Sequence, residues 1–185
     1  MKRRKPLPPW VKVQARVADD TEAKVRALFA RHERGELNRS ELVVELAVLL
    51  RTSVAVAILL ADKYTAMELD KLPGGWVPAD DEDADEVILQ ELHDAYPDEV
   101  DEDHRAAVLG ALVVVGRAVT LDALQQGRTQ ALKGQDVRHW RRSPEPGACE
   151  VCHDLADGIV SIDQVMWTHR GCGCGQEPVL PTDND

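Results

Sequence analysis

The one long apolar stretch of this 185-residue chain reads Leu42-Val-Val-Glu-Leu-Ala-Val-Leu-Leu-Arg-Thr-Ser-Val-Ala-Val-Ala-Ile-Leu-Leu60. Its apolar side chains recur at helical spacing, and from Val54 onward they lie nearly all round the helix, which is typical of a helix at the centre of a bundle. Glu45 and Arg51 would each cost about 2.5–3.5 kcal/mol at the centre of a bilayer. The stretch therefore predicts a buried bundle helix, and we expect no contact with a membrane.

Helix signals flank this stretch on both sides. Asn38-Arg-Ser-Glu41 begins the helix, which extends toward Lys71 and ends at Leu72-Pro-Gly-Gly75. An acidic N-cap pattern, Asp19-Asp-Thr-Glu22, predicts an earlier helix that Gly35 ends. Apolar periodicity predicts helices at 20–34, 81–95 and 99–132, with the stripes Val25, Leu28, Phe29; Val87, Ile88, Leu89, Leu92; and Val108, Leu112, Val115, Val119, Leu124. We predict a mostly α fold, a bundle of three to four helices of which two are long.

The last of these helices is long for the size of the chain. A straight helix over 99–132 would be about 50 Å long, whereas a compact chain of this length has a radius of gyration of about 16 Å. Part of it should therefore be covered by another chain or by a fold-back of the N-terminal arm. Gly110 and Gly116 each weaken the helix by about 1 kcal/mol and indicate a close helix contact or a bend.

The N-terminus is basic and rich in proline. Lys2, Arg3, Arg4 and Lys5 are followed by Pro6-Leu-Pro-Pro9 rather than by an apolar run, so we expect no signal peptide. We interpret residues 1–18 as a flexible arm, 19–134 as the helical domain and 135–185 as a separate cysteine-rich module. The basic run would serve to solubilise the chain, or to contact nucleic acid or an acidic partner.

Acidic residues are concentrated in one segment. The formal net charge is −11, but Asp80 to Asp103 holds 13 of the 33 acidic residues and no Lys or Arg. Without that segment, 20 acidic residues remain against 22 basic ones. The segment is expected either to solvate a helix face or to bind a basic partner, and it would repel the phosphates of duplex DNA.

All four cysteines lie in the last quarter of the chain. Cys149-Glu-Val-Cys152 precedes Cys172-Gly-Cys174, and His169 lies between the two pairs. Two close pairs separated by a short loop can bring four soft ligands to one tetrahedral ion. Because no export signal is expected, a reducing compartment favours one structural zinc per chain over disulfides or bare thiols.

The fourth ligand position has two candidates. Cys149, Cys152 and Cys172 are the firmest ligands, and Cys174 competes with His169 for the remaining position. The reason is that residues 172 and 174 of a strand would point to opposite faces. Short strands are expected at 137–142, 158–162 and 178–180, which makes the module a zinc-stapled α+β unit. Arg138, Trp140, Arg141 and Arg142 form a modest basic-aromatic patch that would suit nucleic acid.

The usual signatures of zinc and nucleotide enzymes are absent from the sequence. Cys149-Glu-Val-Cys152 has the spacing of a thioredoxin-like redox motif, but its flanks are expected to be loop rather than a βαβ unit. Ala148 stands where a nucleobase deaminase has proline, and no H-x-E precedes the cysteines. The chain also lacks H-E-x-x-H, a Walker A sequence and G-x-G-x-x-G. His153-Asp154 is more typical of an exposed pair than of a catalytic dyad. We therefore predict that the protein is not an enzyme.

From Val137 onward the chain resembles the C-terminal module of the phage Mu F-like minor capsid, or head morphogenesis, proteins in the form found in phages of actinobacteria. The resemblance covers about 45 residues. It rests on nine positions in order: Arg138, Trp140, Cys149, Cys152, Leu155, Gly158, His169, Cys172 and Cys174. The family usually ends in His-Pro-x-Cys-Arg-Cys, whereas this chain has His169-Arg-Gly-Cys172-Gly-Cys174 and lacks that proline and inner arginine.

The resemblance implies a structural virion component without enzymatic activity. It implies a minor capsid protein that acts in head assembly, in the head interior or at the portal vertex, and in the host cytoplasm during assembly. Its expected partners are the portal protein and the major capsid protein, further copies of itself, and packaged DNA weakly through Lys2, Arg3, Arg4 and Lys5. The alternative is a zinc-containing nucleic-acid-binding or regulatory protein.

Overall fold

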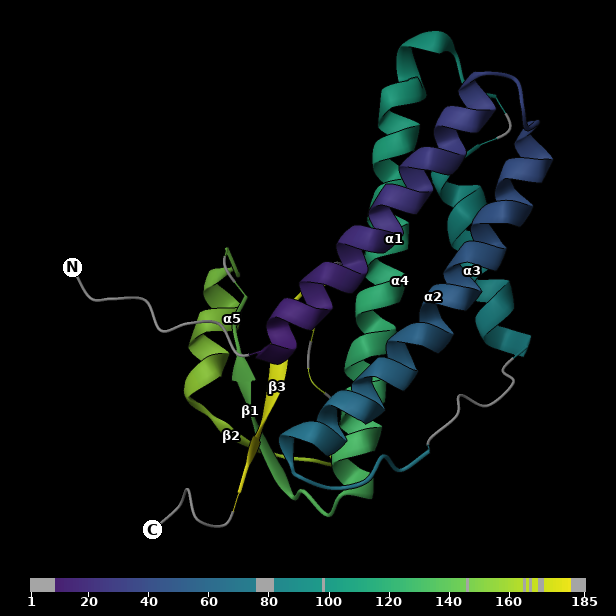
Figure 1. Ribbon diagram of the computed structural model, residues 1–185. Coiled ribbons are helices and arrows are strands. Elements are labelled where there is room, and N and C mark those ends of the chain that lie inside the picture. Colours follow the sequence, from purple (N-terminus) through teal and green to yellow (C-terminus); the bar gives the residue numbers. More distant parts are fainter. Residues whose placement is uncertain are drawn as a thin grey trace.

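Four helices form a bundle, and a small module lies against one end of it (Figure 1). The computed structural model describes residues 9–75, 82–97, 99–145, 147–164, 166, 168–169 and 172–180. The bundle consists of α1 (Pro9–Glu33), α2 (Arg39–Glu68), α3 (Glu82–Ala95) and α4 (Arg105–Gly134). The module contains β1 (His139–Ser143), α5 (Glu150–Asp154), β2 (Ile159–Ser161) and β3 (Gly175–Val179). The predicted fold class, a mostly α bundle with a small C-terminal α+β module, is confirmed.

Helix α2 begins where the sequence predicts. The Asn38 side chain accepts a hydrogen bond from the Glu41 amide at 2.9 Å, and the Glu41 carboxylate accepts one from the Asn38 amide at 2.8 Å. The helix ends at Glu68 rather than near Lys71, because Asp70 adopts the left-handed conformation with φ 53°. The Lys71 amide then bonds back to Ala66 O at 2.8 Å and closes the helix end.

Burial around α2 is less complete than predicted. Leu42, Leu46 and Leu50 are fully buried, but Val56 and Leu59 are 44% and 50% exposed. One face of α2 therefore stays open toward solvent, and its core-facing side is lined by small residues, among them Ala57 and Ala61. In α3, likewise, Ile88 and Leu92 are buried, whereas the predicted core residues Val87 and Leu89 are exposed.

Helix α1 corrects the predicted boundary between arm and bundle. It starts at Pro9, because proline suits the first helical turn, and not near residue 20. Its buried side chains follow helical spacing without a break from the first turn, at Trp10, Gln14, Ala18, Thr21, Val25 and Phe29. Residues 9–18 therefore belong to the bundle. The predicted basic run at residues 2–5 lies outside the described residues.

The predicted N-cap pattern at Asp19–Glu22 is an internal turn of α1. Asp19 and Glu22 face Arg117 of α4, whose guanidinium lies 2.6 Å and 3.1 Å from their carboxylates. Asp20 pairs with Lys24 at 2.6 Å on the exposed face. The acidic residues thus solvate α1 and fix it against α4.

Helix α4 is covered by its own chain. A short 3-10 turn, η1 (Glu102–His104), precedes it, and Asp101 accepts a bond from the His104 amide at 3.1 Å. The start of α1 packs along the C-terminal half of α4, where Trp10 and Ala18 share a core with Leu121 and Leu124. The length of this helix predicted that either another chain or a fold-back of the N-terminal arm would cover part of it. The structure shows the fold-back, through residues 9–18 of α1.

Two segments, Arg39–Glu68 and Glu102–Gly134, are long and apolar enough to cross a membrane by length and composition alone. In this fold they pack against each other inside the bundle, and 44% and 56% of their apolar windows are buried. Central helices of a bundle have the same composition. The absence of membrane contact stays a prediction.

Glycine permits the close approach of α2 and α4. A Cβ on Gly127 would lie 3.0 Å from Ala61 Cβ and 3.1 Å from Ile58 Cα. Gly116 is also in contact, with Val25 Cγ2 3.0 Å from such a Cβ, whereas Gly110 has nothing within 4 Å. The sequence singled out Gly110 and Gly116; the structure assigns a close contact to Gly116 and to Gly127.

This contrast predicts opposite effects of one substitution at two sites of α4. Gly127→Ala should destabilise the protein by about 1–3 kcal/mol, because backbone on α2 must shift to admit the methyl group. Gly110→Ala should stabilise it by up to about 1 kcal/mol through helix propensity alone. Urea unfolding measures both, and a stabilised Gly127→Ala protein would show that the α2–α4 contact is loose.

The sheet has the order β2-β1-β3, with both pairs antiparallel. Trp140 pairs with Val160 on one side and with Pro178 on the other. Along β1, Trp140 and Arg142 are buried and Arg141 is exposed, which is the alternation that predicted this strand. β2 and β3 overlap the predicted strands at 158–162 and 178–180.

Candidate metal centre

The two cysteine pairs are presented by different local structures. Cys149 is the N-cap of α5, and Cys152 follows in the same short helix. Cys172 and Cys174 lie in the irregular segment just before β3. Cys149 is exposed, whereas Cys152, Cys172 and Cys174 are at most 1% exposed. All four are free thiols.

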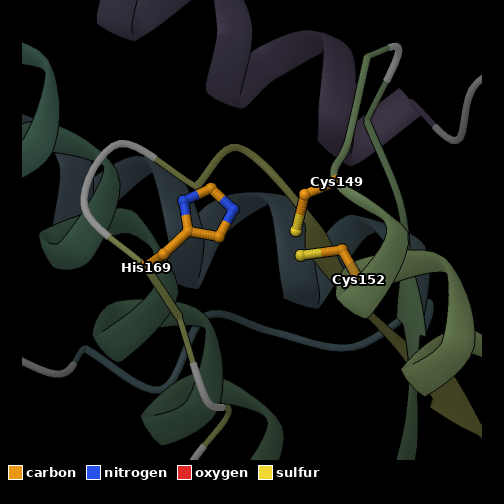
Figure 2. Close-up of side chains that lie close together, drawn as sticks. All are labelled: Cys149, Cys152 and His169. Atoms are coloured by element: carbon orange, nitrogen blue, oxygen red, sulfur yellow. The ribbon is translucent and has the colours of Figure 1, made fainter.

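The predicted ligands form two groups that share one residue. Cys149, Cys152 and His169 have ligand atoms within 4.8 Å of one another, and so do Cys152, Cys172 and Cys174. Figure 2 shows the Cys149 and Cys152 sulfurs turned toward each other beside the imidazole of His169. All five residues that the sequence proposed are therefore brought together, with Cys152 at the centre of the set.

The spacing fits a tetrahedral ion. Zinc–sulfur bonds of about 2.3 Å at tetrahedral angles place two sulfurs about 3.8 Å apart. The Sγ atoms of Cys152 and Cys172 are 3.9 Å apart, whereas a disulfide needs about 2.05 Å. The cluster could hold a metal ion.

The strand argument against Cys174 is wrong. β3 begins at Gly175, so Cys172 and Cys174 precede the ladder and need not alternate between faces. Both sulfurs lie within reach of Cys152. Cys174 is thus grouped with the two buried cysteines, and His169 with Cys149.

The pKa is raised for two of the four thiols, Cys152 and Cys172, and lowered for the other two, Cys149 and Cys174. Burial raises the pKa of the Cys152 thiol to about 11. A hydrogen bond from Cys172 to Cys174 raises the pKa of Cys172, which burial raises further. The same hydrogen bond lowers the pKa of Cys174 and outweighs the opposing effect of burial there. Hydrogen bonds from the amide and side chain of Cys152 lower the pKa of Cys149. Without a cation the buried sulfurs cannot all ionise, so metal binding at this site must release protons.

The bundle holds the second pair of cysteines directly. The Gln125 side chain on α4 donates to Cys172 O at 2.7 Å and to Cys174 O at 3.2 Å. Glu145, in the turn after β1, accepts a bond from the Gly173 amide at 2.7 Å. These residues carry no sequence signal of their own, since their role depends on where α4 and the turn pass.

Gly173 and Gly175, beside the second cysteine pair, lie in close contact with neighbouring side chains. A Cβ on Gly173 would overlap the Glu145 carboxylate, and one on Gly175 would lie 3.0 Å from the Trp10 ring and 3.1 Å from Gln14 and Val11. Positive φ is found at Gly35, Gly75 and Gly147 instead. Gly175 is therefore the point at which the module meets the start of α1.

The predicted basic-aromatic patch is not a surface. Arg142 is 3% exposed and its Nη1 lies 3.5 Å from Cys152 Sγ and 3.8 Å from Cys172 Sγ. Trp140 is also buried, and its indole donates to Ser161 O at 3.2 Å. Arg138 is exposed, and the exposed Arg141 is paired with Glu177 at 3.1 Å. The four residues do not form one surface patch, because alternate residues of β1 face the core.

Comparison of the chain with protein-family models, with curated proteins and with solved structures found no match.

Proposed function

We propose that the C-terminal module binds one zinc ion through Cys149, Cys152, Cys172 and Cys174, and that this ion has a structural role. The observation that supports it best is the position of Cys152, which is fully buried and belongs to both ligand groups. Four protein ligands leave no open coordination position, and zinc sites of that kind are structural rather than catalytic.

Cys174 suits the fourth position better than His169. If His169 were the ligand, the Cys174 thiol would stay fully buried beside two metal-bound sulfurs. Four thiolates avoid that arrangement and leave His169 next to Cys149, where it helps to lower the pKa of that thiol.

Metal analysis tests this site. Protein purified under reducing conditions is expected to contain close to one zinc per chain. His169→Ala should retain the metal, and Cys174→Ser should lose most of it, because a serine hydroxyl is a poor substitute for a buried thiolate. Wild-type protein free of metal, with four titratable thiols, would rule out the site. The reverse order of the two variants would assign the fourth position to His169.

We further propose that the protein is a non-enzymatic minor head protein of a phage, and that it binds the portal or the inner capsid shell during assembly. The support is the resemblance of the module, at nine ordered positions, to the phage Mu F-like head morphogenesis proteins. The exposed apolar side chains of α2, Val44, Val48, Val56 and Leu59, offer a surface for a partner chain or for self-association.

This assignment is tested by co-purification with the portal ring of the encoding phage and by mass spectrometry of purified virions. Binding to the portal or shell and presence in virions would support it. Salt-dependent binding to free DNA, with no affinity for portal or shell, would favour the nucleic-acid-binding alternative. A monodisperse monomer that binds neither would contradict both assignments.

A further inference from the structure

The buried guanidinium of Arg142 lies against the metal centre. Arg142 is the inward-facing neighbour of Arg141 on β1 and is 3% exposed. Its Nη1 approaches Cys152 Sγ at 3.5 Å and Cys172 Sγ at 3.8 Å, which are ordinary distances for an N–H···S bond. Because Nη1 carries two hydrogens, one nitrogen can donate to both sulfurs.

The contact between Arg142 and the sulfurs is favourable because the two groups carry opposite charges. Four thiolates around a divalent ion leave a net charge of −2, and three of the four cysteines are buried. A buried charge without a partner is costly, and so is a buried guanidinium. Placing the guanidinium on the thiolates stabilises both. Among the described residues, Glu145 also reaches this loop, where its carboxylate accepts a hydrogen bond from the Gly173 amide.

We infer that Arg142 is a positioning residue of the metal centre, which donates hydrogen bonds to the Cys152 and Cys172 sulfurs and offsets the negative charge of the thiolate shell. This inference rests on the proposed metal site. In this role Arg142 lowers the electron density on the Cys152 and Cys172 sulfurs, which a side chain that only filled the core of the module would not do. Loss of such an outer-shell partner typically lowers metal affinity about 10–100-fold.

Cobalt(II) is the probe, because thiolate-to-cobalt charge-transfer bands report electron density on the sulfurs. Arg142→Met keeps an unbranched apolar side chain without donors or charge. It should bind cobalt about 10–100-fold more weakly than wild type, and its charge-transfer bands should move to lower energy because the sulfur lone pairs lose their donors. Arg142→Lys should recover a large part of both. Arg141→Met, on the exposed face of the same strand, is the matched control and should change neither.

A measurement on the wild-type protein covers the case in which Arg142→Met does not fold. With a spin-half cadmium isotope in the site, protons that donate to metal-bound sulfur show scalar coupling to the metal. Coupling to the Arg142 guanidinium protons is expected. Its absence from resolved guanidinium signals would overturn the inference, as would cobalt affinity and bands unchanged in Arg142→Met. A wild-type protein that binds no metal would instead overturn the proposed site itself.

Discussion

Replacing Cys152 with serine is expected to abolish stoichiometric metal binding and to unfold the C-terminal module. Cys152 is 0% exposed and belongs to both ligand groups, so its loss leaves each group with only two of its three members. Structural zinc contributes about 10–16 kcal/mol to the folding of small zinc peptides. The core of the module is small and contains three of the cysteines, so little apolar burial remains to replace that contribution.

The bundle should persist in the same variant. Its largest core lies at the end away from the module and joins α1, α2, α3 and α4 through Val25, Phe29, Leu46, Leu92 and Leu112. Far-ultraviolet circular dichroism should therefore keep most of its helical signal. Hydrogen exchange should lose protection over residues 139–179 and at the first turns of α1, which rest on Gly175.

A neighbouring substitution serves as the control. Val151 lies between the two ligands on α5 and is 49% exposed, so Val151→Ala should retain both metal and module. Collapse of the whole helical signal in Cys152→Ser would show that bundle and module fold as one unit.

The second large effect is expected at Arg128 of α4. This side chain is 0% exposed, and it meets the bundle and the module at one point. It donates to Thr65 Oγ1 at 2.8 Å, to the Glu68 carboxylate and to Gln176 O of β3 at 3.3 Å. Its guanidinium also lies 5.2 Å from the centre of the Trp10 ring. One buried cation thus joins α1, α2, α4 and β3.

Arg128→Ala should lower the free energy of unfolding by about 3–5 kcal/mol, because it leaves the Glu68 carboxylate and a buried carbonyl without their donor. Arg128→Met should cost less, since its length refills the space beneath Trp10. Arg51→Ala is the control: Arg51 pairs with Asp85 at the surface, and such pairs contribute about 0–1 kcal/mol. Chemical unfolding ranks the three. Equal losses in Arg128→Ala and Arg51→Ala would mean that Arg128 is solvated in solution.

Local patterns predicted much of this protein. The start of α2 at Asn38-Arg-Ser-Glu41 and the apolar periodicity of α2 and α4 depend only on residues close together in the chain, so they could be recognised without knowing the packing. The ligand cluster was predictable for the same reason. Cys-x2-Cys and Cys-x-Cys each place two sulfurs near one point, and one short loop closes the distance between them.

Predictions were wrong where the outcome depended on residues far away in the sequence. The pattern Asp19–Glu22 has the chemistry of an N-cap, but α1 extends through it because Trp10 and Gln14 find a surface on the end of α4 and on Gly175. Arginine is normally a surface residue, so the sequence alone gives no reason to expect Arg142 and Arg128 to be buried. Only the folded chain supplies the thiols, the carboxylate and the ring that make their burial favourable.

The sequence by itself determined the fold class, the two longest helices, the alternation of β1 and the identity of the five clustered residues that could hold a metal ion, because each follows from spacing along a few residues. Tertiary structure decided where α1 begins, which glycine lets α2 and α4 touch, and that Gln125, Glu145, Arg128 and Arg142 support the module. The hydrogen bonds that give these four polar residues their roles join positions 10 to 60 residues apart. A buried polar side chain is stable only where the fold provides its partner, and that partner cannot be recognised from neighbouring residues.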